Sequence, residues 1–147
     1  MRRNDGFTLV EILLVVVIIT ILAAVAVPRF VGRGEQARVA AAQSDVSSNI
    51  AVALDMFEVD NGFYPTTNQG LAALVEKPTS APTPQRWNGP YLKGGLPKDP
   101  WRRSYVYRCP GNEKRDYDLL SLGPDGVEGT EDDITNWESE SEEAQAG

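Results

Sequence analysis

The sequence predicts an α+β fold in which one long N-terminal α-helix precedes a small antiparallel β-sheet. The first observation is an apolar run from Phe7 to Val27, in which only Thr8, Glu11 and Thr20 are polar. The second is a helical stripe of apolar residues that continues this run as far as Phe57. The third is a pair of short segments rich in β-forming residues late in the chain. A chain of 147 residues allows one globular domain after the run.

The apolar run has the length of a membrane-spanning helix. Its 21 residues would form a helix about 31 Å long, close to the hydrocarbon thickness of about 30 Å. A helix satisfies all its backbone polar groups within the segment, as lipid requires. Glu11 is costly in lipid and therefore needs a partner. Arg2 and Arg3 place the amino terminus in the cytoplasm, so the rest of the chain lies beyond the membrane.

Two other interpretations of the amino terminus remain open on the residues alone. In an ordinary secretory signal, Arg2 and Arg3 would be the basic region and Ile12 to Leu22 the apolar region. Cleavage would follow Ala24-Val25-Ala26, and the mature chain would begin at Val27. Alternatively, the run is an uncleaved anchor that carries Glu11 incidentally.

The run continues into one long helix. Pro28 removes one hydrogen bond and is expected to kink the helix rather than end it. Spacings of 7, 4, 3 and 4 put one apolar face on the helix beyond it, formed by Val39, Val46, Ile50, Ala53 and Phe57. We expect the helix to run from about Thr8 to about Asp60, with Gly62 as a left-handed cap.

The segment after the helix predicts loops, a short helix and two strands. Thr67 or Asn68 is expected to cap a helix over residues 71–75, and the prolines of residues 79–84 indicate an irregular loop. Residues 104–108 and 117–121 are the best strands, joined by a turn at residues 111–114. The aromatic side chains of Trp87, Tyr91 and Trp101 are expected to pack rather than to bind a ligand.

Charge and cysteine content exclude some functions. The net charge is −7, and 12 of the 21 acidic residues lie in residues 113–147 against two basic ones. Such a distribution argues against nucleic-acid binding, which requires a basic face. The single cysteine, Cys109, cannot form an intramolecular disulfide and is expected to act as a small buried hydrophobic residue.

An acidic loop from Leu122 to Asp133 is a candidate cation site. It holds five carboxylates within nine residues and three glycines: Asp125, Glu128, Glu131, Asp132, Asp133, Gly123, Gly126 and Gly129. Oxygen ligands on a flexible loop suit Ca²⁺ better than Mg²⁺, and the lack of histidine disfavours zinc. The spacing does not match an EF-hand, because Val127 and Asn136 fall where ligands are needed. A solvated acidic loop without metal is the other interpretation.

The amino terminus resembles a known class of leader. Arg2-Arg3-Asn4-Asp5-Gly6 followed by Phe7-Thr8-Leu9-Val10-Glu11-Ile12 is similar to the class III leader of type IV pilins and pseudopilins. The resemblance implies cleavage after Gly6 by a prepilin peptidase and methylation of the new Phe7 amine. It also implies that Glu11 pairs with the amino terminus of a neighbouring subunit during fibre assembly.

Further segments resemble the major pseudopilins of type II secretion systems (the general secretion pathway protein G family). They include residues 61–67, 69–71, 89–91, 99–101 and 121–126, and the likeness extends to about residue 137. The resemblance implies a pilin-like fold, with the long helix packed on a small antiparallel sheet. It also implies Ca²⁺ in the acidic loop, held by Asp125, Asp132 and Asp133 and by the carbonyls of Leu122 and Val127. Glu128 or Glu131 could replace Val127, and the metal would take the place of the C-terminal disulfide of many type IV pilins.

The expected function is therefore structural rather than enzymatic. The chain would polymerise through its N-terminal helix into a periplasmic pseudopilus that drives the export of folded proteins across the outer membrane. We expect a leader (1–6), an inner-membrane and fibre-core segment (7–27), a periplasmic head (28–137) and a disordered acidic tail (138–147). Expected partners are further copies, minor pseudopilins, inner-membrane secretion components, prepilin peptidase and membrane lipid, and no nucleic acid. The alternatives are a type IV pilin for adhesion or motility, or an anchored hydrolase using two loop carboxylates.

Overall fold

The computed structural model describes residues 7–137, apart from the side chains of residues 24–32. The predicted leader, with Gly6, and the predicted disordered tail at 138–147 lie outside the described residues. The chain divides into two compact units, residues 1–37 and residues 38–147, and each is described by itself.

The described part of the first unit is helical. Helix α1 (Leu9–Ser44) begins at a Thr8 cap, where the Thr8 hydroxyl accepts a hydrogen bond from the Glu11 N–H at 3.2 Å. A Thr followed three residues later by Glu is the sequence of a capping box, so local chemistry fixes where the helix begins. The helix continues through Pro28, as the sequence predicted. Within the part of the chain described here, no helix meets the length and apolarity required of a membrane span.

In the second unit the helix continues without a break into α2, as predicted, but it contains a wide turn. The end of α1 is followed by one π-helical turn, η1 (Asp45–Asn49), and then by α2 (Ile50–Asn61). The helix ends at Gly62, which has φ +80° and whose N–H donates to Glu58 O. Glycine adopts this left-handed conformation at little cost, which explains the predicted cap.

The buried face of this helix differs from the predicted stripe at its first member. Val39 is 39% exposed, whereas Ala42 is fully buried, so the prediction for Val39 is wrong. Ala42, Val46 and Ile50 follow one another at four-residue steps and are all 0% exposed. In an α-helix, such steps drift by about 40° each around the axis, because one turn takes only about 3.6 residues. The wide turn η1 absorbs this drift and keeps the three side chains on one face.

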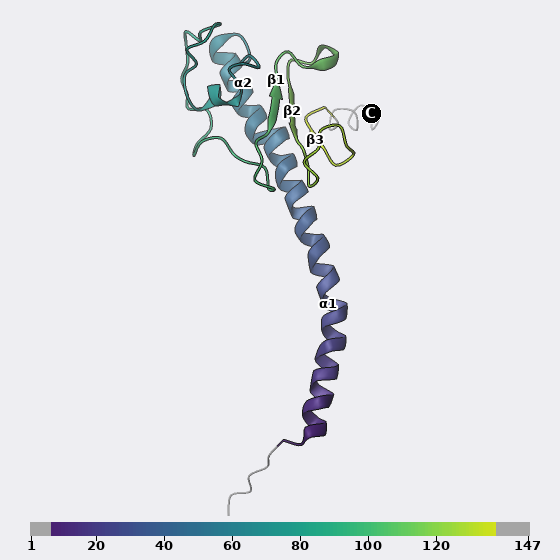
Figure 1. Cartoon of the computed structure of the whole chain (residues 1–147). Helices are drawn as coiled ribbons and strands as arrows, with labels where there is room; N and C mark the ends of the chain where they lie inside the picture. The colour runs from purple at the N-terminus through teal and green to yellow at the C-terminus, as the bar shows by residue number, and fades with distance from the viewer. Residues whose placement is uncertain (1–6, 138–147) are drawn as a thin grey trace, which may run out of the picture. The chain divides into compact units, whose positions relative to one another are not determined.

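The sheet has three short antiparallel strands in the order β1-β2-β3 (Figure 1). They are β1 (Val106–Arg108), β2 (Asp118–Ser121) and β3 (Ile134–Thr135). The register pairs Tyr107 with Leu119 and Ser121 with Ile134. The predicted pair of strands is confirmed in shorter form, and the turn between them contains the 3₁₀ turn η3 (Asn112–Lys114). The two-residue strand β3 was not predicted.

The core lies around α2, with the strands on one side of the helix and the irregular segment after Gly62 on the other (Figure 1). Phe57 is fully buried, and its ring packs edge-on against Phe63 and Tyr91 at 5.8 and 5.7 Å. The indole of Trp87 donates to Ala73 O at 2.9 Å. Trp87, Tyr91 and Trp101 all pack against the core, which confirms the role predicted for them.

The short helix predicted in the irregular segment is present, but no side chain caps it. It is a single 3₁₀ turn, η2 (Leu71–Leu74), preceded by Gly70 and without a side-chain cap. The prediction that Thr67 or Asn68 would cap it is wrong. The Thr67 hydroxyl instead bonds to the backbone of Cys109, donating to its C=O at 3.0 Å and accepting from its N–H at 2.9 Å.

The C-terminal region is tied to the sheet by polar contacts. The Asn136 side chain accepts from the Leu119 N–H at 2.8 Å and donates to Tyr117 O at 3.3 Å. The guanidinium of Arg115 lies 4.6 Å from the ring centroid of Trp137, in cation–π geometry. These contacts hold the end of the described chain without a disulfide. Cys109 is half-buried and has a free thiol, whose pKa is raised by burial.

Candidate functional site

The first candidate region is the exposed start of α1. The large apolar side chains from Phe7 to Leu22 are 47–86% exposed in this single chain. Such an extended apolar surface is typical of a segment that contacts other proteins or lipid. Glu11 lies in the first turn of the helix, and among the described residues none donates a hydrogen bond to its carboxylate. The Glu11 carboxylate is therefore available to a group outside the chain.

The second candidate region is the acidic loop after β2, and its frame is a tight turn. The N–H of Gly126 donates to Leu122 O at 3.0 Å. Gly123 has φ +57°, and a Cβ there would lie 2.1 Å from Asp132 O. Both the conformation and the close approach therefore require glycine. This packing brings the beginning of the loop against Asp132, near its end.

The predicted side-chain ligands fall into two groups. The Asp125 carboxylate accepts from the Val127 N–H at 2.8 Å, and the Asp125 N–H points at the carboxylate of Asp132 at 3.3 Å. The Asp133 carboxylate faces the Gly129 N–H at 2.6 Å. Asp125 and Asp132 are thus neighbours, whereas Asp133 bonds to the middle of the loop.

Local hydrogen bonds also lower the pKa of Asp132. The Thr130 hydroxyl, which donates to it at 2.8 Å, lowers the pKa of Asp132, and the Asp125 N–H adds to this effect. Asp132 therefore keeps the charge that a cation would require to a lower pH than an ordinary aspartate does.

The predicted Val127 ligand and one of its two alternatives, Glu128, already have partners within the protein. Glu128 forms an ion pair with Arg108 at 2.7 Å, and this contact lowers the pKa of Glu128. Glu131 is exposed. The carbonyl of Val127 accepts from the Thr130 hydroxyl at 3.1 Å. Ordinary protein contacts thus account for Glu128, which the sequence alone left as a candidate ligand.

One oxygen in the loop has no partner. Oδ1 of Asp133 is buried and, within the described residues, bonds to no donor. Buried polar atoms are normally satisfied, so an unpaired carboxylate oxygen fits a missing cation or water. In the part of the chain that the structure describes, however, no three acidic, histidine or cysteine side chains gather around one point.

Sequence reasoning did not find the residue that supports the loop from outside. The guanidinium of Arg103 donates to the carbonyls of Gly123 and Pro124, in the second case at 3.1 Å. Nothing in the order of the residues links Arg103 to a loop 20 residues later. Only the antiparallel pairing of the segments that contain β1 and β2 brings them together.

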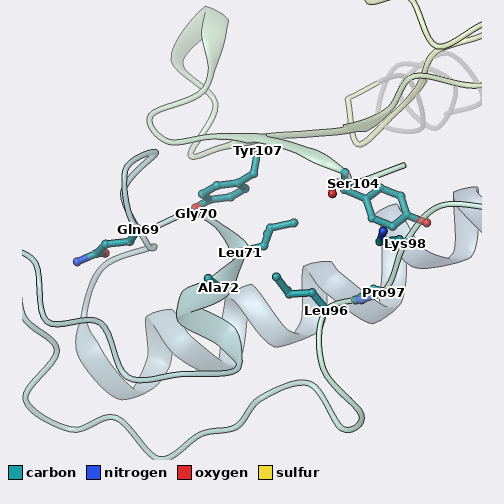
Figure 2. Close-up of a pocket in the computed structure, with 10 residues that line it drawn as sticks. Gln69, Gly70, Leu71, Ala72, Leu96, Pro97, Lys98, Ser104 and Tyr107 are labelled. Carbon is teal, nitrogen blue, oxygen red and sulfur yellow. The ribbon is translucent and has the colours of Figure 1, made fainter. Parts of the chain in front are cut away.

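A shallow cavity of about 480 Å³ lies elsewhere on the second unit. Figure 2 shows the segment from Gln69 to Ala72, the segment from Leu96 to Lys98, and Ser104 and Tyr107 around it. Its lining is largely apolar, and Lys98 is its one residue that is charged at neutral pH. The cavity contains no pair of carboxylates that would act as acid and base.

Comparison with known proteins identifies the family. The family described as type II secretion system, protein G, matches residues 29–137, and the prokaryotic N-terminal methylation motif matches residues 1–27. The chain belongs to the type II secretion system protein G family.

Individual relatives agree over nearly the whole chain. The core protein G of Pseudomonas aeruginosa is 52% identical over 142 residues, which cover 94% of this chain and 98% of the relative. That of Escherichia coli K12 is 51% identical over 140 residues, covering 93% and 95%. The crystal structure of the major pseudopilin from the type 2 secretion system of enterohaemorrhagic E. coli matches with a TM-score of 0.65 and 44% identity. That match covers 74% of this chain and 89% of that one.

These findings confirm the expected class of function. The chain is a pseudopilin, a structural subunit of the type II secretion pseudopilus, and not an enzyme. The pilin-like combination of a long helix and a small antiparallel sheet is confirmed as well. Membership also implies assembly with other components of the secretion system.

Proposed function

We propose that this pseudopilin is cut after Gly6, methylated at Phe7 and held in the inner membrane by residues 7–27, with its head in the periplasm. Copies then polymerise through their N-terminal helices into a fibre that drives folded proteins across the outer membrane. Prepilin peptidase, minor pseudopilins, inner-membrane secretion components and lipid are the proposed partners.

The observation that carries this proposal is the exposed apolar surface of α1 together with the free carboxylate of Glu11. No soluble subunit would leave every large side chain from Phe7 to Leu22 about half exposed or more, because apolar surface in water is unfavourable. Lipid covers this surface in the membrane, and neighbouring helices cover it in the fibre.

Glu11 provides the specific part of the assembly contact. A carboxylate in hydrocarbon costs on the order of 3 kcal/mol, and that cost falls when it meets an opposite charge. Cleavage after Gly6 would create a protonated amine on Phe7, four residues before Glu11 in the chain. The pairing of Glu11 with the amine of a neighbouring copy would satisfy both charges and set the register between subunits.

The experiment that tests this proposal separates assembly from processing. The variant Glu11→Leu should be cleaved and remain in the membrane, because it is more apolar, but it should form no fibres and support no secretion. Thr20→Leu is a matched control, because the Thr20 hydroxyl is already satisfied by Val16 O at 2.8 Å. Normal fibres from Glu11→Leu would overturn the pairing, and loss of fibres in both variants would show that the run tolerates no substitution.

We also propose that the acidic loop binds Ca²⁺. The side chains of Asp125, Asp132 and Asp133 and the carbonyls of Leu122 and Val127 would hold it. The proposal is supported by the unpaired buried oxygen of Asp133 and by the lowered pKa of Asp132. Bound Ca²⁺ would supply positive charge to a loop whose carboxylates otherwise repel one another.

A further inference from the structure

Next to the end of β2, a buried carboxylate organises a tight turn. Asp99 is only 3% exposed. One of its oxygens accepts from the N–H groups of Trp101 and Arg103, at 3.1 and 2.7 Å, and the other accepts from the Ser121 hydroxyl at 2.9 Å. The N–H of Asp99 in turn donates to Arg103 O at 2.9 Å. The backbone of Arg103 is therefore fixed directly beside the last residue of β2.

From this position the Arg103 side chain reaches the start of the acidic loop. Its two terminal nitrogens donate to consecutive carbonyls, those of Gly123 and Pro124. A guanidinium is a planar fork with fixed donors, so binding two carbonyls determines the direction of the backbone between them. The contact also brings a permanent positive charge to the start of the acidic loop.

The loop is shaped to receive this guanidinium. Gly126 has φ +73°, and a Cβ there would lie 2.6 Å from Cζ of Arg103. The Gly126 N–H closes the turn onto Leu122 O. Residues 122–126 thus fold around the arginine, and the positive φ at position 126 favours glycine.

The rest of the loop, residues 127–133, has no comparable external support from the residues that the structure describes. Within residues 127–133, Thr130 and Asp132 bond to groups of the loop itself, as does Asp133 through the Gly129 N–H. One external contact is the ion pair of Glu128 with Arg108, and both of those side chains are more than a third exposed. Exposed ion pairs contribute little to stability.

We propose that Arg103, positioned by Asp99, is a built-in cation that orders residues 122–126 without metal, whereas residues 127–133 become ordered when the loop binds its cation. The second half rests on the proposed calcium site, and the first half does not. In this arrangement residues 122–126 are ordered with or without the cation, and residues 127–133 are ordered only when it is bound. Arg103 acts as a positioning residue, because it orients carbonyls of the loop and is not itself a ligand.

Amide hydrogen exchange on the full chain in detergent tests the two halves separately. In wild-type protein with chelator, the Gly123 and Gly126 amides should be protected, whereas those of residues 127–133 should exchange quickly. Calcium should then slow exchange in residues 127–133, whereas Gly123 and Gly126 should already be protected without it. In Arg103→Ala, exchange at Gly123 and Gly126 should be about ten-fold faster in chelator, because two charge-assisted hydrogen bonds are lost.

Two further variants keep the result interpretable. Arg103→Lys keeps the charge but loses the planar fork, so its exchange at Gly126 should lie between those of wild type and Arg103→Ala. Arg86→Ala removes an exposed arginine elsewhere and should exchange as wild type does. Retained protection of β1 and β2 in each variant shows that the head is folded.

The outcomes distinguish the two proposals. Wild-type exchange at Gly123 and Gly126 in Arg103→Ala would overturn the arginine clamp. Fast exchange at both glycines in wild-type chelator samples would overturn it as well. Identical exchange of residues 127–133 with calcium and with chelator would overturn the metal site and leave the clamp intact.

Discussion

At the scale of single residues, Arg102 has an unfavourable backbone conformation and Asp118 has an unfavourable location for a charged side chain. Arg102 adopts φ +69°, a left-handed conformation that costs a non-glycine residue roughly 1–2 kcal/mol. Asp118 is completely buried, yet it carries a charge that Arg115 balances at 2.8 Å. For each of these two residues we predict how a substitution changes the stability of the protein.

Arg102→Gly should raise stability. Glycine removes the conformational strain at this position, although it adds flexibility to the unfolded chain, so the net gain should be up to about 1 kcal/mol. Urea unfolding of the variant measures the change directly. Lys98→Gly, in the same exposed loop, is the control and should lower stability slightly. Equal losses in the two variants would show that the Arg102 conformation carries no strain.

Asp118 should make stability depend on acid pH. Burial alone would raise the pKa of Asp118, but hydrogen bonds from Arg115 and from the Asn112 N–H outweigh it and lower the pKa below 3.8. A carboxylate with a lowered folded pKa stabilises the protein above its unfolded pKa, and this stabilisation disappears as pH falls through the folded value.

Asp118→Asn provides the measurement for that dependence. The variant should melt at a lower temperature than wild type at pH 7, because the amide cannot replace the charged contact with Arg115. The difference should begin to shrink as pH falls below about 4, and it should vanish once pH is below the folded pKa of Asp118, where wild type loses the same contact. A constant difference from pH 7 to pH 2 would contradict the assignment.

At the scale of elements, the sequence predicted what short-range patterns encode. The helix, its Gly62 cap and the antiparallel pair of strands follow from periodicity and turn residues, and all three are present. The sequence did not reveal the wide turn η1, because Val46 and Ile50 fit an α-helical stripe equally well. Strand β3 escaped prediction because two residues after Asp132-Asp133 carry no alternation.

The acidic loop marks the limit of sequence reasoning at this scale. Composition identified the carboxylates, but only the fold separates Glu128, which pairs with Arg108, from Asp132 and Asp133. The contributions of Arg103 and Asn136 depend on contacts between segments far apart in the chain. No local pattern encodes such contacts.

Calcium bound to the acidic loop should stabilise the folded protein. A ligand that binds only the folded form adds about 2.7 kcal/mol when its concentration is 100 times Kd. The protein should therefore melt at a higher temperature in millimolar calcium than in chelator, as calorimetry would show. Asp125→Ala and Asp132→Ala should remove most of that difference and make the loop sensitive to protease, whereas Glu140→Ala in the tail should not. If wild type had the same melting temperature in calcium and in chelator, the loop would be a solvated acidic loop without metal.

At the scale of the whole molecule, removal of the proposed leader would change the charge of the chain. Arg2, Arg3 and Asp5 contribute +1 of the total −7, so removal of the leader would leave a mature chain of charge −8. The methylation motif matches residues 1–27, and protein G begins to match at residue 29. The two matches divide the chain close to Pro28, between the apolar run and the head.

An intact mass of the protein from membranes should show a chain that starts at methylated Phe7. Gly6 is the only residue small enough before the cut, so Gly6→Trp should keep its leader and remain in the membrane unassembled. Asn4→Trp, two residues away, should still be cut. A mature terminus at Val27 would instead establish an ordinary secretory signal and exclude the proposed fibre contact.

The wide turn at Asp45–Asn49 limits which insertions and deletions of residues this helix can tolerate. It contains one residue more than an α-helical path would use, so it resembles a single-residue insertion that the helix has absorbed in place. Loss of one residue there would turn Ala42 by about 100° about the axis and away from the core that Ile50 still faces. The number of residues in the turn thus sets the direction in which side chains before it point, relative to those after it. A change of one residue at this point would therefore take Ala42 out of the core cluster that it shares with Ile50.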